Sequence, residues 1–338
     1  MNSIRKPAAA GASSRLTFMP AAQTPPASER KWYKGNLHTH TINSDGDSAP
    51  DAVARWYKEH HYNFLVLSDH DFVTPIEGLS SIFAAEDRFL LISGEEISPE
   101  IGNKPIHVNG LDIHRTIAPI VGASVVDTLQ RNVDAVRAAG GTPSLNHPNF
   151  RWAVTPAEMG QIHGLKLFEV YNGHRGTNDA GGGGFPSLEE MWDAVLSAGR
   201  EVYGIAVDDA HKFKVFGPEY SNPGRGWVSV KASELSTEAI LSSLNSGEFY
   251  ASTGVVLENV SRLPNELRVY LEEDEEDRGE EYTTEFIGQG GRLLSKSFDN
   301  PAVYTLKPGD TYVRAKVTSS NAAYAWVQPV FAGAAASR

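Results

Sequence analysis

Histidine and carboxylate side chains recur at short spacings between residues 38 and 211 of the chain. His38 and His40 form an H-x-H pair, and alternate residues of a strand share one face, so both imidazoles can reach one ion. Asp209 and His211 form a D-x-H pair of similar spacing. Imidazole nitrogens and carboxylate oxygens are ligands of divalent cations in proteins. The pattern therefore predicts a metal-binding site.

More side chains of the same types stand between these two pairs, each after a short apolar run or in a turn. They are Asp45, Asp69, His70, Glu96, His107 and His147. Burying so many polar and charged groups together without a counter-charge costs free energy. Divalent cations remove that cost, so the joint pattern favours metal binding over a purely structural role.

Apolar runs and helical patterns alternate from Lys31 to about Leu257 and must position these side chains. Strands are predicted at 31–40, 63–68, 88–94, 142–147, 166–172 and 202–207, and helices at 50–60, from Ser124, at 156–163, from Ser187 and from Ser236. Ser124 with Asp127, and Ser187 with Glu190, have the spacing of helix capping boxes. Alternation of this kind predicts an α/β fold with a parallel, barrel-like sheet, whose chemistry lies at the C-terminal ends of the strands.

Composition divides the chain into three segments. Residues 1–30 are rich in Ala, Ser and Pro and are expected to form a flexible tail. Residues 31–257 carry the α/β pattern, and residues 258–338 form short β-type runs that predict a small β-rich appendage. Eight acidic residues between Glu272 and Glu281 are expected to form a solvated loop.

The chain has 338 residues, a net charge of −12 and no cysteine. Thiolate metal sites and cysteine nucleophiles are therefore excluded, and the negative charge opposes non-specific binding to nucleic acid. No apolar run is long enough to span a membrane. The N-terminal segment lacks the apolar stretch of a secretory signal, so a cytoplasmic protein is expected.

Six ordered motifs resemble the PHP (polymerase and histidinol phosphatase) family. They are GNLHTHTINSDGDSAP, LSDHD, GEEI, the single His107, NHP and DDAH, over residues 33–255. The resemblance implies a distorted (β/α)7 barrel that holds two or three ions of zinc, manganese or iron. It implies one ion on His38, His40, Glu96 and Asp209, a second shared through Glu96 with His107 and His147, and a third on Asp45, His70 and His211. Some relatives have His at the Asp45 position, which implies a weaker third site here.

The GEE motif offers two candidates for the bridging carboxylate, Glu95 and Glu96. The family places its ligand just before an apolar residue, here Ile97, which favours Glu96. Adjacent residues of a strand face opposite sides, so Glu95 is expected to point elsewhere.

A finer resemblance links the chain to the branch of this family named after carbaryl hydrolases. It is carried by EVYNGHRG, MWDAVLSAG, GIAVDDAH, GWVSV, SGEFYASTG and the terminal AWVQPVF. In that branch a PHP barrel precedes a β-rich tail, and some members cleave aryl carbamates rather than phosphate esters.

Two cations sharing a water can supply hydroxide at neutral pH, so no serine or cysteine nucleophile is required. Asp209 or Asp69 is a candidate for orienting that hydroxide or passing protons, and His211 for protonating the leaving oxygen. Arg151 is the first candidate for binding an anionic substrate, because arginine binds phosphate in a fork. His174, Arg175, Lys212 and Arg225 are further candidates.

Two other features bear on the substrate. The glycine-rich segment 176–185 is a candidate lid. Trp152 and Tyr171 are candidates for an apolar wall, with core packing as the equal alternative.

Three functions remain open from the sequence. The first is a phosphoesterase on small phosphate esters, nucleotides or oligonucleotide ends. The second is a hydrolase of aryl carbamates or carboxylic esters, and the third is a catalytically inactive scaffold. The expected partner is a small-molecule substrate, with nucleic acid only as substrate, and the sequence leaves the oligomeric state open.

Overall fold

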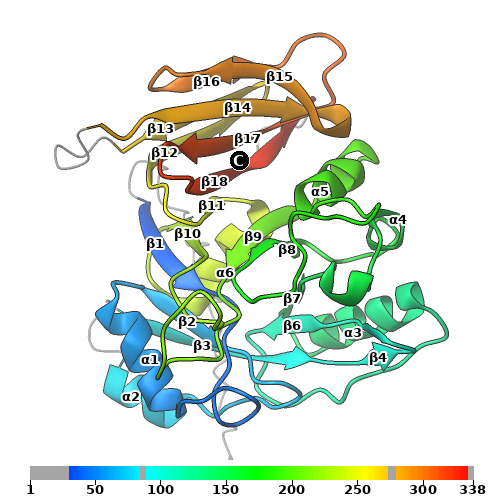
Figure 1. The fold of residues 1–338 in the computed structure, drawn as a ribbon, viewed down its shortest axis with the longest axis vertical. Coiled ribbons are helices and arrows are strands. Elements are labelled where there is room, and N and C mark those ends of the chain that lie inside the picture. Colours follow the sequence, from blue (N-terminus) through cyan, green and yellow to red (C-terminus); the bar gives the residue numbers. More distant parts are fainter. Residues whose placement is uncertain (1–29, 84–88, 273–278, 334–338) are drawn as a thin grey trace, which may run out of the picture.

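The computed structural model describes residues 30–83, 89–272 and 279–333 of the chain. The expected N-terminal tail and most of the acidic run, residues 273–278, lie outside the described residues. Figure 1 shows the chain as two stacked parts, with the C-terminal strands above the α/β part.

The helices and strands begin and end as follows. The helices are α1 (Pro50–Glu59), α2 (Glu77–Phe83), α3 (Val125–Ala138), α4 (Pro156–Met159), α5 (Leu188–Ser197) and α6 (Thr237–Ser246). The strands of the α/β part are β1 (Lys31–Asn36), β2 (Phe64–Leu67), β3 (Leu90–Ile97), β4 (Glu100–Ile101), β5 (Lys104–Pro105), β6 (Val108–Leu111), β7 (Thr142–Leu145), β8 (Leu167–Asn172), β9 (Tyr203–Val207), β10 (Trp227–Ala232) and β11 (Phe249–Ser252). The C-terminal strands are β12 (Leu257–Leu263), β13 (Glu266–Leu271), β14 (Tyr282–Gly288), β15 (Arg292–Ser297), β16 (Ala302–Thr305), β17 (Tyr312–Ser319) and β18 (Tyr324–Phe331).

Side-chain caps fix the start of two predicted helices. Ser187 and Glu190 form a complete capping box at α5. At α3 the Ser124 hydroxyl accepts from the Asp127 N–H, but the Asp127 carboxylate accepts from the Ala123 N–H rather than from Ser124. The predicted box at α3 is therefore only half correct, because the carboxylate reaches one residue further back.

Thirteen strands form one sheet in the order β15-β14-β17-β18-β11-β10-β1-β2-β3-β6-β7-β8-β9. Strands β1 to β3 are mutually parallel, as are β7 to β9. Strand β6 is antiparallel to both β3 and β7, and β10 is antiparallel to β1. The prediction of a parallel sheet is wrong at these two strands. The link from β3 to β6 holds only the short β4–β5 pair, whereas a parallel crossover needs a dozen or more residues.

The sheet is open, which corrects the expectation of a barrel. Among the described strands, β9 pairs only with β8. The other edge of β9 is covered by a side chain of β18: the Gly204 N–H donates to Gln328 Oε1 (3.0 Å), and Gln328 Nε2 donates to the Gly204 carbonyl (2.8 Å). This amide pairs with the backbone of one residue of that edge, and a single parallel bridge, Thr39 to Ala210, lies beyond the end of β9.

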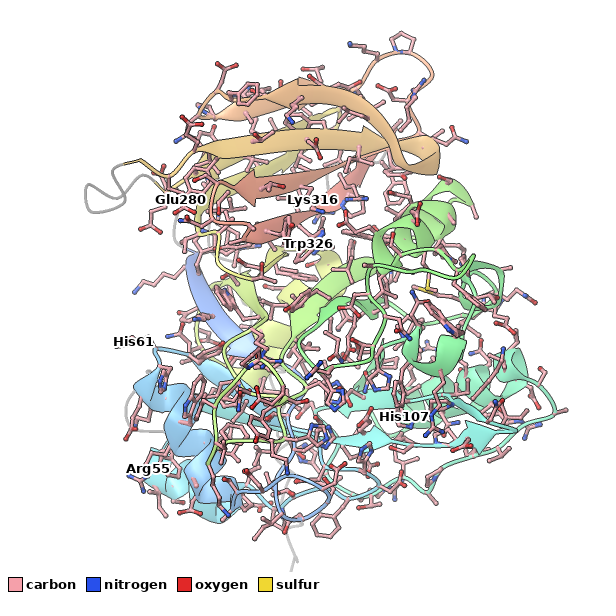
Figure 2. The ribbon with its side chains drawn as sticks, in the orientation of Figure 1. Arg55, His61, His107, Glu280, Lys316 and Trp326 are labelled. Carbon is pink, nitrogen blue, oxygen red and sulfur yellow. The ribbon has the colours of Figure 1, made fainter. Side chains whose placement is uncertain are left out.

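The C-terminal strands continue the main sheet, because β18 pairs antiparallel with β11. Strands β12, β13 and β16 form a second sheet in the upper part of Figure 1. Side chains of both sheets share one apolar core. Lys316 and Trp326 lie between the upper sheets and the lower part (Figure 2), where Lys316 Nζ contacts Glu189 of α5 and the Trp326 ring stacks on Tyr171 of β8. The predicted domain boundary between residues 257 and 258 stays a prediction.

Within the described ranges, every helix is too short or too polar to cross a membrane.

Candidate metal centre

The ends of β1 and β9 meet beyond the last residue of each strand. Thr39 and Ala210 form an isolated parallel bridge. The Asp209 N–H donates to the His38 carbonyl (3.0 Å), and the His40 N–H donates to the Ala210 carbonyl (3.0 Å). Backbone hydrogen bonds thus place the H-x-H and D-x-H pairs side by side.

His38 and His40 point to the same side, as the alternation of a strand requires. Their Nε2 atoms are 3.1 Å apart, and both side chains are fully buried. Asp209 Oδ1 lies 3.4 Å from His38 Nε2 and 3.1 Å from His40 Nε2. Two ring nitrogens and a carboxylate oxygen therefore converge on one point.

Glu96 divides its two carboxylate oxygens between two sets of histidines. Oε2 lies 3.2 Å from His38 Nε2, 3.4 Å from His40 Nε2 and 3.1 Å from His70 Nδ1. Oε1 lies 2.9 Å from His107 Nδ1 and 3.1 Å from His147 Nε2. The Asn146 side chain also donates to Oε1. A carboxylate placed in this way can bind one cation with each oxygen.

The neighbouring Glu95 side chain faces away from the histidines. Its Oε1 accepts from the Ile117 N–H at 2.6 Å, and its carboxyl is buried. Burial raises the pKa of Glu95 to about 7, against the lowering effect of that hydrogen bond. Glu95 and Glu96 therefore occupy opposite faces of β3, as the strand geometry predicts.

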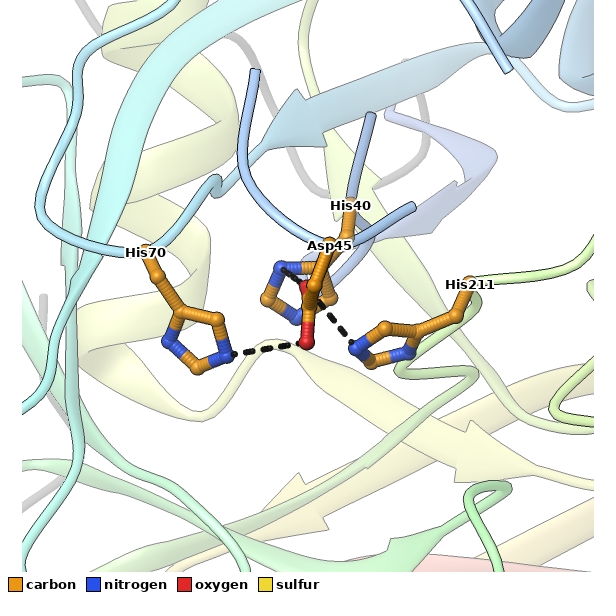
Figure 3. Close-up of side chains that lie close together, drawn as sticks. All are labelled: His40, Asp45, His70 and His211. Carbon is orange, nitrogen blue, oxygen red and sulfur yellow. Dashed lines mark ion pairs between the residues drawn. The ribbon is translucent and has the colours of Figure 1, made fainter. Parts of the chain in front are cut away.

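Asp45 reaches a third set of histidines at the open side of the cluster (Figure 3). Its oxygens lie 3.6 Å from His40 Nδ1, 3.7 Å from His70 Nε2 and 3.2 Å from His211 Nε2. His70 and His211 stand on either side of it in Figure 3. The Asp45 side chain is 55% exposed, whereas that of Glu96 is 1% exposed. This set is the most open to solvent.

Four overlapping groups of ligand atoms have their members within 4.8 Å of one another. The groups are His38, His40 and Glu96; His38, His147 and Asp209; His70, Glu96 and His107; and His40, Asp45, His70 and His211. All nine predicted ligands belong to at least one group. The groups share members, so the allotment of each ligand to a particular ion stays a prediction.

The donor set fits divalent cations. His38 Nδ1 lies 2.7 Å from a Glu169 carboxylate oxygen, and His211 Nδ1 lies 2.9 Å from the Asp209 carbonyl. These oxygens only accept, so each Nδ1 carries a proton, and a ring in this tautomer, when neutral, presents its Nε2 lone pair to the cluster. Imidazole nitrogens with carboxylate oxygens suit zinc, manganese or iron.

The pKa shifts reflect how closely these groups are packed. Burial alone would raise the pKa of Glu96, but the charges of His38, His70 and His107 hold it well below its usual range. Burial, together with the charge of His211, lowers the pKa of His40 to about 4. The histidine charges thus keep Glu96 ionised, while burial and His211 oppose the protonation of His40, so both side chains can offer lone pairs to a cation.

Two of the ligands have left-handed backbone conformations. The φ angle is 48° at Asp209 and 22° at His147, neither of which is glycine. Such conformations cost free energy and persist only where surrounding contacts impose them, which is common at functional sites. At Asp209 the surrounding contacts include the hydrogen bond from its N–H to the His38 carbonyl.

No protein-family model matches the chain. A curated 5′-3′ exoribonuclease from Haemophilus influenzae is 35% identical over 83 residues, which span 25% of this chain and only 30% of that protein.

A solved two-domain protein from Bacteroides vulgatus, containing a predicted PHP-like metal-dependent phosphoesterase, aligns with a TM-score of 0.51 at 17% identity. The alignment covers 91% of this chain and 95% of that one. The chain shares that PHP-like fold. A lesion-specific endonuclease from Pyrococcus furiosus aligns less well, with a TM-score of 0.40, 13% identity, and 64% and 56% of the two chains.

Within this PHP-like fold, Asp69 occupies a different environment from the nine ligands. Its Oδ1 accepts from the Thr41 N–H and the Ser44 hydroxyl, each at 2.7 Å, and its Oδ2 accepts from the hydroxyls of Thr41 and Thr74. The carboxylate thereby holds the loop that carries Asp45. Its predicted part in proton transfer stays a prediction.

The predicted substrate-binding residues lie at varying distances from the cluster. The His174 ring packs against the His211 ring, with centroids 5.1 Å apart. The Arg151 side chain is 57% exposed and its nearest carboxylate is Glu100, at 4.0 Å. Arg175 is exposed. Of the three, the structure brings only His174 into contact with a candidate ligand.

Arg225, Tyr171 and Trp152 have structural contacts. Arg225 donates to the carbonyls of Gly173 and Gly217, and Tyr171 stacks on Trp326. Trp152 stacks on Phe185 with ring centroids 4.4 Å apart. Phe185 ends the glycine-rich segment, where it exchanges two backbone hydrogen bonds with Gly182.

Sequence reasoning missed Glu169, Asn172 and Asn146, which contact the ligands without belonging to a ligand motif. Glu169 is fully buried on β8. A charged residue inside the apolar run LFEVY was the available signal, because an unpaired buried carboxylate is costly.

Proposed function

We propose that this chain is a metal-dependent hydrolase that acts on small phosphate esters or nucleotides. The observation that carries the proposal is the split of the Glu96 oxygens between two sets of histidines, at 2.9–3.4 Å. That arrangement is the one a carboxylate needs to bridge two cations. The PHP-like fold supports the phosphoester substrate by analogy with its neighbour's description.

Three ligand sets are proposed. His38, His40, Glu96 and Asp209 would hold one ion, Glu96, His107 and His147 a second, and Asp45, His70 and His211 a third. Zinc, manganese and iron all suit these donors. When bound, such ions supply Lewis acidity and a nucleophilic water at neutral pH.

The protein's own residues have separate tasks. Asp209 Oδ2 accepts from Asn172, which fixes the carboxylate while Oδ1, facing His40, would bind an ion. His211 borders the open side beside His174 and, when it does not bind the third ion, is the proposed donor of a proton to the leaving oxygen. His174 is the proposed contact for the substrate's anionic group, with Arg151 and Arg175 as further cations at greater reach.

A second candidate function is hydrolysis of aryl carbamates or carboxylic esters, in keeping with the carbaryl-hydrolase-like branch. It is favoured by the stack of the partly buried Trp152 on Phe185, which is 43% exposed. The scarcity of described cationic side chains in contact with the ligands also favours it. An aryl group can pack on such a surface.

The test is a comparison of hydrolysis rates by the metal-loaded protein. The substrates are p-nitrophenyl phosphate, nucleoside monophosphates and 1-naphthyl methylcarbamate. We expect the phosphate esters to give the highest kcat/KM. Faster turnover of the carbamate would favour the second function. Turnover of none, with full metal content, would favour an inactive scaffold and contradict both.

A further inference from the structure

Glu169 is a buried carboxylate outside the nine proposed ligands that nevertheless contacts two of them. Its Oε1 accepts from His38 Nδ1 at 2.7 Å, and its Oε2 accepts from the His147 backbone N–H at 2.7 Å. The side chain is 0% exposed. Its oxygens are therefore occupied by groups of the ligand residues rather than by solvent.

Asn172 lies beside Glu169 and contacts the third member of the same ligand group. Its Nδ2 donates to Glu169 Oε2 at 2.8 Å and to Asp209 Oδ2 at 3.1 Å. Its Oδ1 accepts from the His174 N–H at 2.7 Å. Glu169 and Asn172 together thus contact all of one ligand group, His38, His147 and Asp209.

A bulge in β8 makes this pairing possible. Residues three apart in a regular strand face opposite sides of the sheet. The pairing of β8 with β9 shifts between Glu169 and Tyr171, where one extra residue enters β8. Glu169 and Asn172 consequently face the same side, and bulges commonly re-aim side chains in this way next to active sites.

We propose that Glu169 and Asn172 form a positioning pair that fixes the orientation of His38, His147 and Asp209 for metal binding. Glu169 selects the His38 tautomer with the proton on Nδ1, which directs the Nε2 lone pair into the cluster. Asn172 sets the rotation of the Asp209 carboxylate. This inference rests on the proposed metal-dependent function.

The chemistry of the pair requires a carboxylate at position 169. Glu169 accepts three hydrogen bonds with its two oxygens. Glutamine has one acceptor oxygen, and its NH2 group only donates. In Glu169→Gln the NH2 group must therefore face either His38 Nδ1–H or the two donors on the other side. The shape is kept, but at least one ligand loses its partner.

The experiment is a titration of metal-free protein with Co²⁺, followed by visible absorption and calorimetry. The variants are Glu169→Gln, Asn172→Ala and the double variant, with Glu95→Gln as a matched control for a buried carboxylate on another strand. We expect Glu169→Gln to weaken binding of one Co²⁺ equivalent by about 10–100-fold and to change its absorption bands. Asn172→Ala should act in the same direction, and Glu95→Gln should bind Co²⁺ as the wild type does.

The double variant tests whether the two residues act as a pair. Contacting residues are non-additive, so its loss of affinity should be smaller than the product of the two single losses. Thermal melts of the metal-free variants check folding, and Asn172→Ala alone carries the test if Glu169→Gln fails to fold.

Three results would overturn the inference. They are wild-type Co²⁺ binding in Glu169→Gln, an equal loss in Glu95→Gln, and purely multiplicative losses in the double variant. A wild-type protein that binds no Co²⁺ would instead contradict the proposed function itself.

Discussion

The guanidinium group of Arg314 on β17 donates two hydrogen bonds, each 2.7 Å long, to the carboxylate of Asp193 on α5. The Arg314 side chain is 1% exposed and also lies over the Trp192 ring. The Tyr312 hydroxyl donates to the same carboxylate. A buried, bidentate ion pair thus joins the C-terminal sheet to a helix of the α/β part.

Asp193→Ala should destabilise the protein strongly, because it leaves the buried Arg314 charge without its bidentate partner and with only the Glu189 carboxylate, 3.6 Å away. We expect a loss of about 3–5 kcal/mol in the free energy of unfolding, measured by denaturant titration. Arg131→Ala is the control, since it removes an exposed ion pair with Asp127 on α3 and should change stability by less than about 1 kcal/mol. Equal losses of unfolding free energy in the two variants would show that the buried pair contributes no more to stability than the exposed one.

Glu96→Gln should remove at least one metal ion and reduce kcat/KM by about 10³-fold, or about 4 kcal/mol of transition-state stabilisation. The substitution keeps the shape but replaces one bridging oxygen by a group that cannot bind a cation. Metal analysis and steady-state kinetics measure both effects. Glu95→Gln is the control and should stay within about tenfold of the wild type. Full metal content and wild-type turnover in Glu96→Gln would contradict the proposal that Glu96 bridges two cations.

Asp45→Ala should cost one metal equivalent while two are retained. Asp45 is the exposed member of its set, and its oxygens lie farther from His40 and His70 than the Glu96 oxygens lie from their histidines. The ion that it helps to hold should therefore exchange most readily. Elemental analysis after gel filtration measures the stoichiometry. Loss of all metal in this variant would mean that the three sites assemble only together.

The stability of the metal-free protein should depend on pH through Asp179. Burial raises the pKa of Asp179 from 3.8 to about 7, although the Asn172 N–H hydrogen bond opposes that shift. Between these values the folded state holds a proton that the unfolded state has released, so stability falls as the pH rises through this range. Asp179→Asn should flatten that slope and increase the relative stability above pH ~7, measured by thermal melts in a chelator. An unchanged slope would mean that Asp179 is ionised in the folded protein.

Residue type and local spacing were sufficient to predict six strands (β1, β2, β3, β7, β8 and β9) and five helices of the α/β part, and the candidate ligands near their ends, but not α2, β6, β10 or β11. Alternation in H-x-H places both imidazoles on one side, and adjacency in GEE places Glu95 and Glu96 on opposite sides, because strand geometry has a period of two. The cap of α5 follows from Ser187 and Glu190 for a similarly local reason. These features need no information from distant parts of the chain.

Tertiary structure decided what depends on distant contacts. Strand β6 runs antiparallel to β3, Gln328 pairs with the backbone of Gly204 in β9, and Arg314 pairs with Asp193. Each of these contacts joins segments whose pairing no local pattern specifies. The same holds for Glu169, whose role requires a bulge that brings Asn172 to its side. A bulge changes the register that a period of two would predict, so only the folded chain shows which polar residues of β8 face the metal ligands.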